Sequence, residues 1–299
     1  MPSQPPKVLA VGASGKFAGM VIPELVRRGA TVRGLIHDSA KEGLVRQHGA
    51  TEIAVGDLTD RASLDEALKG VDSVFYIAPA FLPNEAEVGK GMVEAAVQAG
   101  VRRFVFSSVI HPILGALANH SAKAPVEEAL LTSGMEYTFL HPALFFQNFT
   151  GSWTRIVQTG VLAGPWSVNS RFSRVDYRDV AEAAAVALTT DRLLYGTFEL
   201  CAEGWHNRTD VASIIGEVLG RPIKAERIDP KMAAADAGPG APALERMFDW
   251  YDKRGLMGSA LSLRAILGRE PRTLRDFFEE LNAQAEPGSV RQPAQKMRV

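Results

Sequence analysis

The chain has 299 residues, of which 46% are hydrophobic and 22% are charged, and its net charge is -1. This length and composition suit one large domain or two unequal ones with a sizeable core, while the near-neutral charge gives no electrostatic basis for binding nucleic acid or a membrane surface. The single cysteine, Cys201, excludes an internal disulfide and a cysteine cluster for a metal.

A glycine-rich turn near the start of the chain is its most informative feature. The run VLAVGASGKFAG begins with an apolar strand at 8–11, turns through Gly12, Ser14 and Gly15, and opens into a helix that ends at Gly29. This order places backbone N–H groups and a helix N-terminus where a pyrophosphate can bind. Side chains at Gly12 and Gly15 would block the approach of the ligand to the backbone. The alternative is an ordinary strand-to-helix turn, because the spacing is G-x-x-G and not G-x-G-x-x-G.

Strand-like and helix-like segments then alternate through roughly the first half of the chain. Apolar runs that predict strands lie at 31–36, 52–55, 73–78, 104–108 and 137–140. Helical spacing lies between them, at 40–48, 61–69, 85–99 and 121–132. The alternation predicts an α/β fold with a doubly wound parallel sheet. With a further strand at 197–200, we expect about seven strands.

Beyond Pro142 this alternation breaks down. A helix is expected at 179–189, and helical segments follow at 209–219, to 253 after the Ala/Gly/Pro stretch 233–243, and at 273–281. We therefore predict a dinucleotide-binding domain at 1–205 and a smaller, mainly helical lobe on the substrate side at 206–284, with interleaved segments allowed. Residues 285–299 are polar without periodicity and predict a flexible tail.

The ends of the second and third predicted strands carry polar residues suited to the adenosine half of a dinucleotide. Asp57 can accept from the adenine amino group while Leu58 packs on the ring; the alternative for Asp57 is a turn or capping residue. His37, with Lys16 and Lys41, favours the 2′-phosphate of NADP, whereas Asp38 disfavours it. The alternative is that these are solvated surface residues.

The chain resembles the NmrA-like family of atypical short-chain dehydrogenases/reductases, which includes isoflavone-reductase-like and triphenylmethane-reductase-like enzymes. The resemblance covers nearly the whole chain and rests on GASGKFAG, LIHDSAK, GDLTDRASL, FYIAP, AAVQAGVRRFVFSSV, HSAKAPVEEALLTSGMEYTFLHPALFFQNF, VDYRDVAEAAAVAL and LGREPRTLRDFFEE. It implies an NAD(P)-binding Rossmann fold. The residues expected to bind the cofactor are Gly12, Ala13, Ser14, Gly15, Lys16, Phe17, His37, Asp57, Leu58, Ala78, Pro79, Lys123 and Phe145.

The departures from the family's wider pattern concern catalysis. Short-chain dehydrogenases commonly use a serine, a tyrosine and a lysine, the last two spaced Tyr-x-x-x-Lys. Here Lys123 fits the lysine, but Asn119 stands at the tyrosine position and Val109 at the serine position. Lys123 can still hold the nicotinamide ribose, and its alternative is a surface pair with Glu127.

Three histidines are candidates for the missing acid, and each has a structural alternative. His111, His120 and His141 all fall near the carboxyl edge of the predicted sheet, and a histidine ordinarily titrates near neutral pH. His120 is the preferred candidate. In the loop after the sixth strand, Leu144, Phe145, Phe146 and Phe149, with Trp153 and Trp166, either wall a nicotinamide and an apolar substrate or form core.

These residues predict an NAD(P)H-dependent oxidoreductase that transfers hydride to an apolar, conjugated or quinone-like small molecule, with NADP(H) preferred over NAD(H) and no metal. The alternative is a non-catalytic NADP(H)-binding redox sensor that acts through protein partners; a nucleotide-sugar epimerase or dehydratase would need the absent tyrosine. The start MPSQPPK has no signal-peptide run and no segment approaches the ~18 apolar residues of a membrane span. We expect a soluble, cytoplasmic monomer or homodimer.

Overall fold

The computed structural model describes residues 5–79, 82 and 84–285. Their contacts divide the chain into two compact units with interleaved segments. The first unit holds the residues up to 115, with 119–142 and 177–199. The second holds 116–118, 143–176 and the residues from 200 onward.

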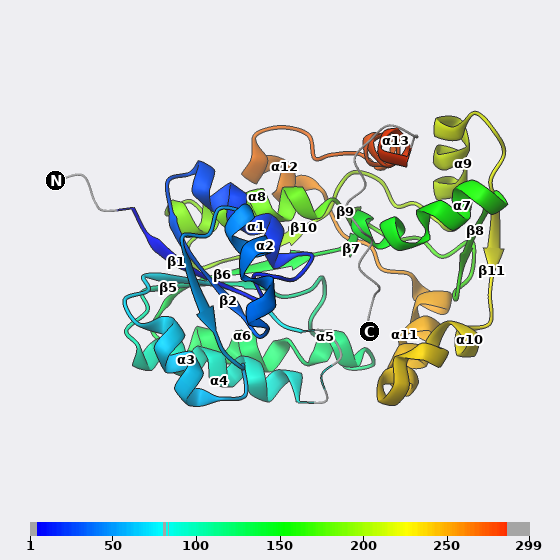
Figure 1. The fold of residues 1–299 in the computed structure, drawn as a ribbon. Helices are drawn as coiled ribbons and strands as arrows, with labels where there is room; N and C mark the ends of the chain where they lie inside the picture. The colour runs from blue at the N-terminus through cyan, green and yellow to red at the C-terminus, as the bar shows by residue number, and fades with distance from the viewer. Residues whose placement is uncertain (1–4, 80–81, 83, 286–299) are drawn as a thin grey trace. The chain divides into compact units, whose positions relative to one another are not determined.

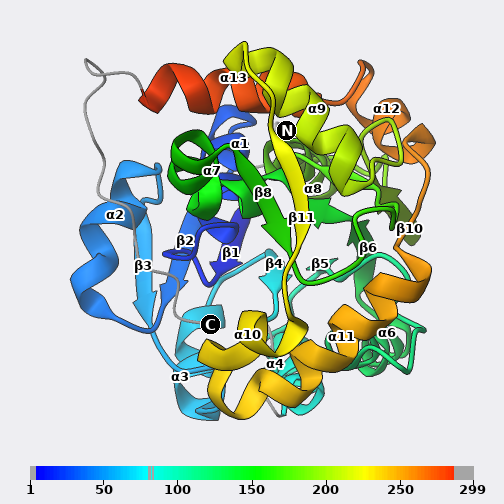
Figure 2. The same cartoon turned by 90° about the vertical axis from the view of Figure 1, so that its right-hand side faces the viewer.

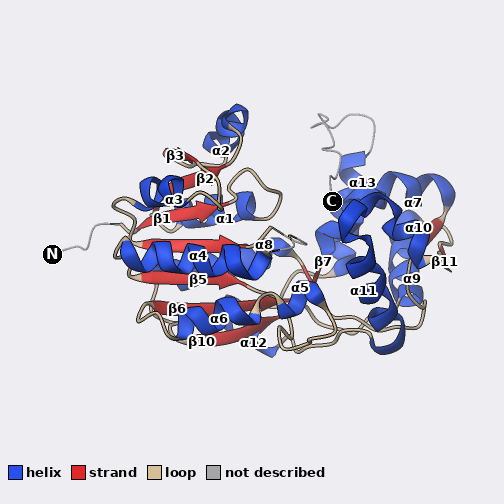
Figure 3. Ribbon diagram, turned by 90° about the horizontal axis from the view of Figure 1, so that it is seen from below, coloured by secondary structure: helices blue, strands red, loops and turns tan. Residues whose placement is uncertain are grey.

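The first unit is built on a seven-stranded parallel sheet of order β10-β6-β5-β4-β1-β2-β3 (Figure 3). The strands are β1 (Lys7–Val11), β2 (Thr31–Ile36), β3 (Glu52–Val55), β4 (Ser73–Ile77), β5 (Arg103–Ser107), β6 (Glu136–Pro142) and β10 (Gly196–Leu200). The whole of β5 and nearly all of β1 and β4 are buried. Continuous apolar strands of this kind require helices on both faces of the sheet, which confirms the predicted doubly wound architecture.

Helices cover both faces of this sheet (Figure 1). They are α1 (Ala18–Arg27), the 3-10 turn η1 (Ser39–Lys41), α2 (Glu42–Gln47), α3 (Arg61–Leu68), α4 (Glu85–Gln98), α5 (Ala118–Ser121), α6 (Ala124–Leu131) and α8 (Tyr177–Thr189). On one face α1 packs along α8, and on the other α4 lies between α3 and α6. The apolar sides of α3, α4 and α6 meet Leu9, Val74 and Phe104 of the strands in one continuous core.

Two predicted helices differ from the structure at their ends. The helix expected at 121–132 is two helices, because α5 ends at Ser121 and α6 begins at Ala124. Pro125 lies in the first turn of α6, where its missing N–H costs nothing, but it cannot continue a preceding helix. The helix expected at 40–48 begins with the 3-10 turn η1, which Asp38 caps by accepting from Ala40 N.

The second unit is mainly helical and contains four short strands that the sequence analysis did not predict. Its elements are β7 (Leu144–Phe145), η2 (Phe146–Ser152), α7 (Trp153–Thr159), β8 (Val161–Gly164), β9 (Arg174–Val175), α9 (Arg208–Leu219), β11 (Lys224–Arg227), α10 (Pro230–Ala234), η3 (Ala235–Gly240), α11 (Ala241–Arg254), α12 (Leu261–Leu267) and α13 (Leu274–Ala285). The strands form two parallel pairs, β11 with β8 and β7 with β9. Figure 2 shows β8 and β11 side by side, with α13 along α9.

The core of the second unit surrounds Phe278, which is fully buried and stacks on Trp153 with ring centroids 5.5 Å apart. Phe146 belongs to this core, with Val211 and Ile215 of α9. Of the predicted tail at 285–299, Ala285 is the last residue of α13 and the remainder lies outside the described residues. Within the described part of the chain, no helix has the length and apolar character needed to cross a membrane.

Candidate functional site

The glycine turn between β1 and α1 is tight, and its two glycines are required for different reasons. Gly12 has a φ of 69°, a left-handed conformation that L side chains rarely adopt. No protein atom lies within 4 Å of a Cβ built there, so conformation and not crowding within the protein requires this glycine. Gly15 donates its N–H to Gly12 O at 2.8 Å, and a Cβ on Gly15 would lie 3.0 Å from that same oxygen.

The turn is fixed to the neighbouring strand and helix. Ala13 N donates to Leu35 O of β2 at 3.0 Å. A Cβ on Gly34 would lie 2.9 Å from Ala13 Cβ and 2.6 Å from Cγ1 of Val45 in α2. The turn therefore packs so closely on β2 that only glycine fits at residue 34.

The start of α1 is suited to an anion. Phe17 occupies the N-cap position without a side-chain cap, and the first turn of the helix carries no acidic residue. Backbone N–H groups and the helix dipole at such an end favour negative charge. Lys16 adds a cation beside it: its Nζ lies 5.8 Å from the centroid of the Phe17 ring, and partial burial lowers its pKa. Phe17 is in turn held by Tyr177, with ring centroids 4.7 Å apart.

His37 and Asp57 lie together at the carboxyl edge of the sheet, where β2 and β3 end. His37 Nδ1 is 3.7 Å from Asp57 Oδ2, and both side chains are exposed. The other oxygen of Asp57 accepts from Thr59 N and Thr59 Oγ1, each at 2.7 Å, and these bonds lower the pKa of the carboxyl group. Asp57 is thus a turn residue, as its structural alternative stated. Its Oδ2 faces His37.

Of the other residues predicted to bind the adenosine half of the dinucleotide, two pack in the protein core and one is exposed. Leu58 packs against the core cluster, and Ala78 is buried within it. Pro79 is exposed at the end of β4.

Lys123 forms a buried ion pair that the sequence analysis did not predict. Its side chain lies at the start of α6, and the residue is only 8% exposed. Its Nζ donates to Oε1 of Glu85, the first residue of α4, which is 3% exposed, and to the carbonyl oxygen of Asn119 at 3.3 Å. The alternative of a surface pair with Glu127 is therefore wrong. Tyr76 of β4 lies near the pair. Burial and the charge of Glu85 both raise the pKa of its phenol, which has no hydrogen-bond partner among the described residues.

His120 is 1% exposed, at the end of the first unit's α5. Its Nδ1 lies 3.4 Å from the carbonyl oxygen of His111. Burial lowers the pKa of His120 to about 4, although contacts with the carbonyls of His111 and Ile110 oppose the shift. The imidazole is therefore neutral at pH 7, and it does not titrate near neutrality as the sequence analysis expected.

In the part of the chain that the structure describes, the other two candidate histidines contact acidic residues, unlike His120. His141 Nε2 lies 2.9 Å from Glu127 Oε1, and the same oxygen accepts from Ser108 Oγ at 2.5 Å. His111 has a φ of 54° and its Nδ1 lies 3.6 Å from Glu199 Oε1. His141 is thus fixed inside the fold as its structural alternative describes.

The aromatic loop after β6 contributes both to the core of the second unit and to the lining of a cavity there. Phe146 and Trp153 are buried in the core of the second unit, and Phe149 packs against it. Phe145 and Phe149, with Trp166, instead line a cavity of about 180 Å³ in this unit. Two arginines, Arg174 and Arg208, line the same cavity, and the sequence analysis singled out neither.

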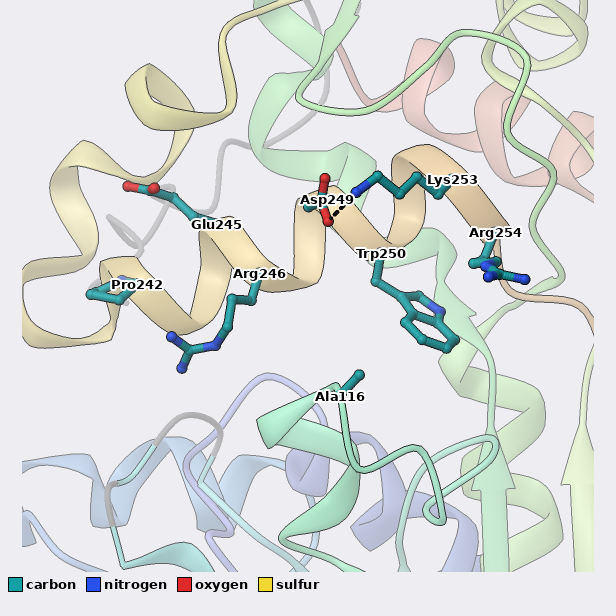
Figure 4. A pocket seen from close by; sticks show the side chains of 8 residues that line it. All are labelled: Ala116, Pro242, Glu245, Arg246, Asp249, Trp250, Lys253 and Arg254. Atoms are coloured by element: carbon teal, nitrogen blue, oxygen red, sulfur yellow. Dashed lines mark hydrogen bonds and ion pairs between the residues drawn. The ribbon is translucent and has the colours of Figure 1, made fainter.

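A larger hollow of about 620 Å³ runs along α11 in the second unit. Figure 4 shows Arg246 and Trp250 pointing from the helix toward Ala116. Asp249 and Lys253 form an ion pair of 2.8 Å one turn apart on the same helix. Charges paired along an exposed helix in this way are typical of a solvated surface.

The profile of the NmrA-like family matches residues 4–280 of the chain. An NAD(P)H azoreductase of Xenophilus azovorans is 27% identical over 281 residues, which are 90% of this chain and 96% of that protein. Quinone oxidoreductase 2 of Escherichia coli is 23% identical over 92% of this chain and 98% of its own length.

Solved structures share the fold. An NADPH-dependent quinone oxidoreductase of Escherichia coli, in complex with NADPH, superposes with a TM-score of 0.80 at 22% identity, over 92% of this chain and 99% of that one. A triphenylmethane reductase of Citrobacter sp. gives 0.81 at 21% identity, over 92% and 99% of the two chains.

Proposed function

Because the chain belongs to the NmrA-like family, we propose that it is an NAD(P)H-dependent oxidoreductase that reduces an apolar, conjugated or quinone-like small molecule. The observation that carries the proposal is the uncapped start of α1 behind the Gly12–Gly15 turn. An exposed glycine backbone beside a helix N-terminus is suited to a pyrophosphate. Relatives with full-length matches support it, since their names describe an azoreductase and a quinone oxidoreductase.

In this proposal the turn from Gly12 to Phe17 holds the pyrophosphate, with Lys16 as a cation beside it. His37 and Lys16 favour the 2′-phosphate, so NADP(H) is the preferred cofactor. Asp38 opposes this preference, because its exposed carboxylate keeps its negative charge while it caps η1. Asp57, Leu58, Ala78 and Pro79 are the proposed residues of the adenosine side, at the ends of β3 and β4.

The nicotinamide, when bound, supplies a hydride. Lys123 is the proposed catalytic residue: its ammonium group donates to the ribose hydroxyls and stabilises negative charge that develops on the acceptor. Glu85 fixes the position of the ammonium group through the buried ion pair. An electron-poor acceptor needs no strong protein acid because its anionic product is delocalised, and this fits Asn119 at the position of the usual tyrosine.

His120 remains a candidate proton donor only as a neutral imidazole. A group whose pKa is about 4 cannot hold a transferable proton at pH 7 as an imidazolium. Its contacts with the backbone of Ile110 and His111 favour a positioning role instead. Changing His120 to Gln separates the two roles, because glutamine keeps a hydrogen-bond donor and acceptor without the imidazole: a small change in the hydride rate favours positioning, and a loss that matches that of Lys123→Met favours proton donation.

Two measurements test the proposed function. Calorimetric titration of the protein should give tighter binding of NADPH than of NADH; tighter NADH binding would refute the preference, and no binding of either would refute the cofactor. Following NADPH absorbance against quinones, enones, aryl dyes, aromatic aldehydes and polar aliphatic aldehydes should then identify the acceptor class. Turnover confined to polar aldehydes would contradict the apolar, conjugated acceptor.

A redox sensor is the second candidate, and the pairing of Lys123 with Glu85 favours it. An ammonium group that is paired with a buried carboxylate stabilises negative charge on a substrate less strongly. Some relatives have names that describe assembly rather than catalysis, such as a photosystem II assembly factor of Guillardia theta, which is 26% identical over 74% of this chain. Firm nucleotide binding without turnover of any acceptor would favour the sensor.

A further inference from the structure

Two buried arginines line the cavity of about 180 Å³ in the second unit. Arg174 lies on β9 and Arg208 begins α9, and they are 7% and 5% exposed. Burial lowers the pKa of each guanidinium group to about 10, with repulsion from Arg208 contributing at Arg174. Both groups therefore remain cationic at neutral pH.

Neither cation has an anionic partner within ion-pair distance among the residues that the structure describes. Arg174 Nη1 donates to His206 O at 2.8 Å and to Phe172 O at 3.4 Å. Arg208 Nη1 donates to Trp166 O at 2.7 Å and to Glu226 O at 3.1 Å. Arg208 Nη2 is buried and has no hydrogen-bond partner. Buried charges are ordinarily paired. Here Asp252 and Asp210 attract Arg208 and Arg174 from beyond ion-pair distance, so the two cations lack a close anion in the described part of the chain.

The unpartnered Nη2 of Arg208 lies close to the wall of the cavity. A Cβ on Gly164 of β8 would lie 2.4 Å from Arg208 Nη2, and both residues line the cavity. Aromatic rings hold the two guanidinium groups: Arg208 Cζ lies 5.4 Å from the centroid of Trp166, and Arg174 Cζ lies 5.8 Å from that of Phe149. The cavity thus combines aromatic walls with buried positive charge.

We propose that this cavity is a binding site for a small aromatic carboxylate, whose carboxylate pairs with Arg208 and Arg174 and whose ring lies against Phe149 and Trp166. Its size fits, because an apolar protein cavity of about 150 Å³ holds benzene and this one is about 180 Å³. A planar carboxylate matches the fork of a guanidinium group. The site goes beyond the proposed function, since every residue of its wall belongs to the second unit and Phe145 is the only one of them that the sequence assigns to the nucleotide.

The test begins with the unmodified, nucleotide-free chain. Benzoate, the uncharged isostere benzamide and inorganic phosphate are titrated by calorimetry, with intrinsic tryptophan fluorescence, to which Trp166 contributes, as a second readout. Benzoate should bind about tenfold or more tightly than benzamide, as expected for charge-assisted hydrogen bonds in a buried site. Equal binding of the two would overturn recognition of the charge. Phosphate that binds as tightly as benzoate would overturn the aromatic part, and no benzoate binding at millimolar concentration would overturn the site.

Variants locate the binding. Arg208→Met should weaken benzoate binding about 10- to 100-fold, while Arg275→Gln, at an exposed arginine of α13, should leave it unchanged. Full benzoate affinity in Arg208→Met would overturn the assignment. If that variant does not fold, Arg174→Gln replaces it, and if neither folds the comparison of benzoate with benzamide on the unmodified chain decides. These outcomes are independent of nucleotide binding and turnover, so they do not depend on the proposed oxidoreductase.

Discussion

Removing either partner of the Lys123–Glu85 ion pair should cost far more than removing an exposed ion pair. Lys123→Met keeps much of the side-chain volume but leaves the carboxylate of Glu85, which is 3% exposed, without its cation. Breaking a buried pair in this way costs about 3–5 kcal/mol. Lys90→Met is the matched control: Lys90 lies on α4 and pairs with Glu87 at 2.7 Å in an exposed position. It should change the free energy of unfolding by about 0.5 kcal/mol or less.

The double variant Lys123→Met with Glu85→Gln separates stability from catalysis. It leaves no unpaired charge, so its loss of stability should be smaller than the sum of the single losses by about 1–3 kcal/mol. The rate of hydride transfer should not recover, because the ammonium group is still absent. We expect that rate to fall about ten- to a thousandfold in both variants that lack Lys123.

Denaturant unfolding at pH 7 measures the stability cycle, and single-turnover oxidation of NADPH measures the rate. The stability of Lys123→Met relative to the unmodified chain should also decrease as pH rises, because a lone buried carboxyl group resists ionisation. Additive stability losses would refute the coupled buried pair. Full activity and full nucleotide affinity in Lys123→Met would refute its catalytic assignment.

Three further outcomes follow from single residues. Burial lowers the pKa of His120 from 6.5 to about 4, so between these pH values the folded state binds fewer protons than the unfolded state. Acidification from pH 6.5 to 4 should therefore remove about 3 kcal/mol from the free energy of unfolding. Denaturant titrations should show a smaller loss in His120→Gln. Gly34→Ala should cost about 1–3 kcal/mol of stability and weaken nucleotide binding, whereas Gly43→Ala, where a Cβ meets nothing within 4 Å, should not destabilise the chain in thermal melts. His37→Glu should lower the ratio of NADPH to NADH affinity in calorimetry by about tenfold through repulsion of the 2′-phosphate.

The strands and helices of the first unit could be predicted from the sequence because the local pattern of apolar residues there agrees with the tertiary packing. The strands at 31–36 and 52–55 have the predicted bounds, since short, mainly apolar runs that end at polar or glycine residues leave few other choices. The helix at 121–132 was predicted as continuous because helical spacing persists across the break, and Pro125 alone marks the start of a new helix.

Contacts that join residues far apart in the chain could not be predicted from the sequence. Glu85 and Lys123 are 38 residues apart, whereas sequence spacing reports only neighbours on the same helix, such as Glu127. Likewise Arg174 and Arg208 resemble ordinary surface cations in the sequence, and only the fold buries them. The lowered pKa of His120 could not be predicted from the sequence for the same reason, because tertiary packing determines its burial.

The order of the chain delays completion of the sheet during synthesis. A ribosome delivers residues 143–176 of the second unit before α8 and β10 of the first. Until α8 emerges, the apolar surface that it covers on β4, β5, β6 and α1 stays open, and β6 has no outer neighbour. Exposed strand edges and apolar faces of this kind promote aggregation. A fragment that stops at Pro142 should therefore be insoluble when expressed alone, and no single cut in the chain releases the first unit whole.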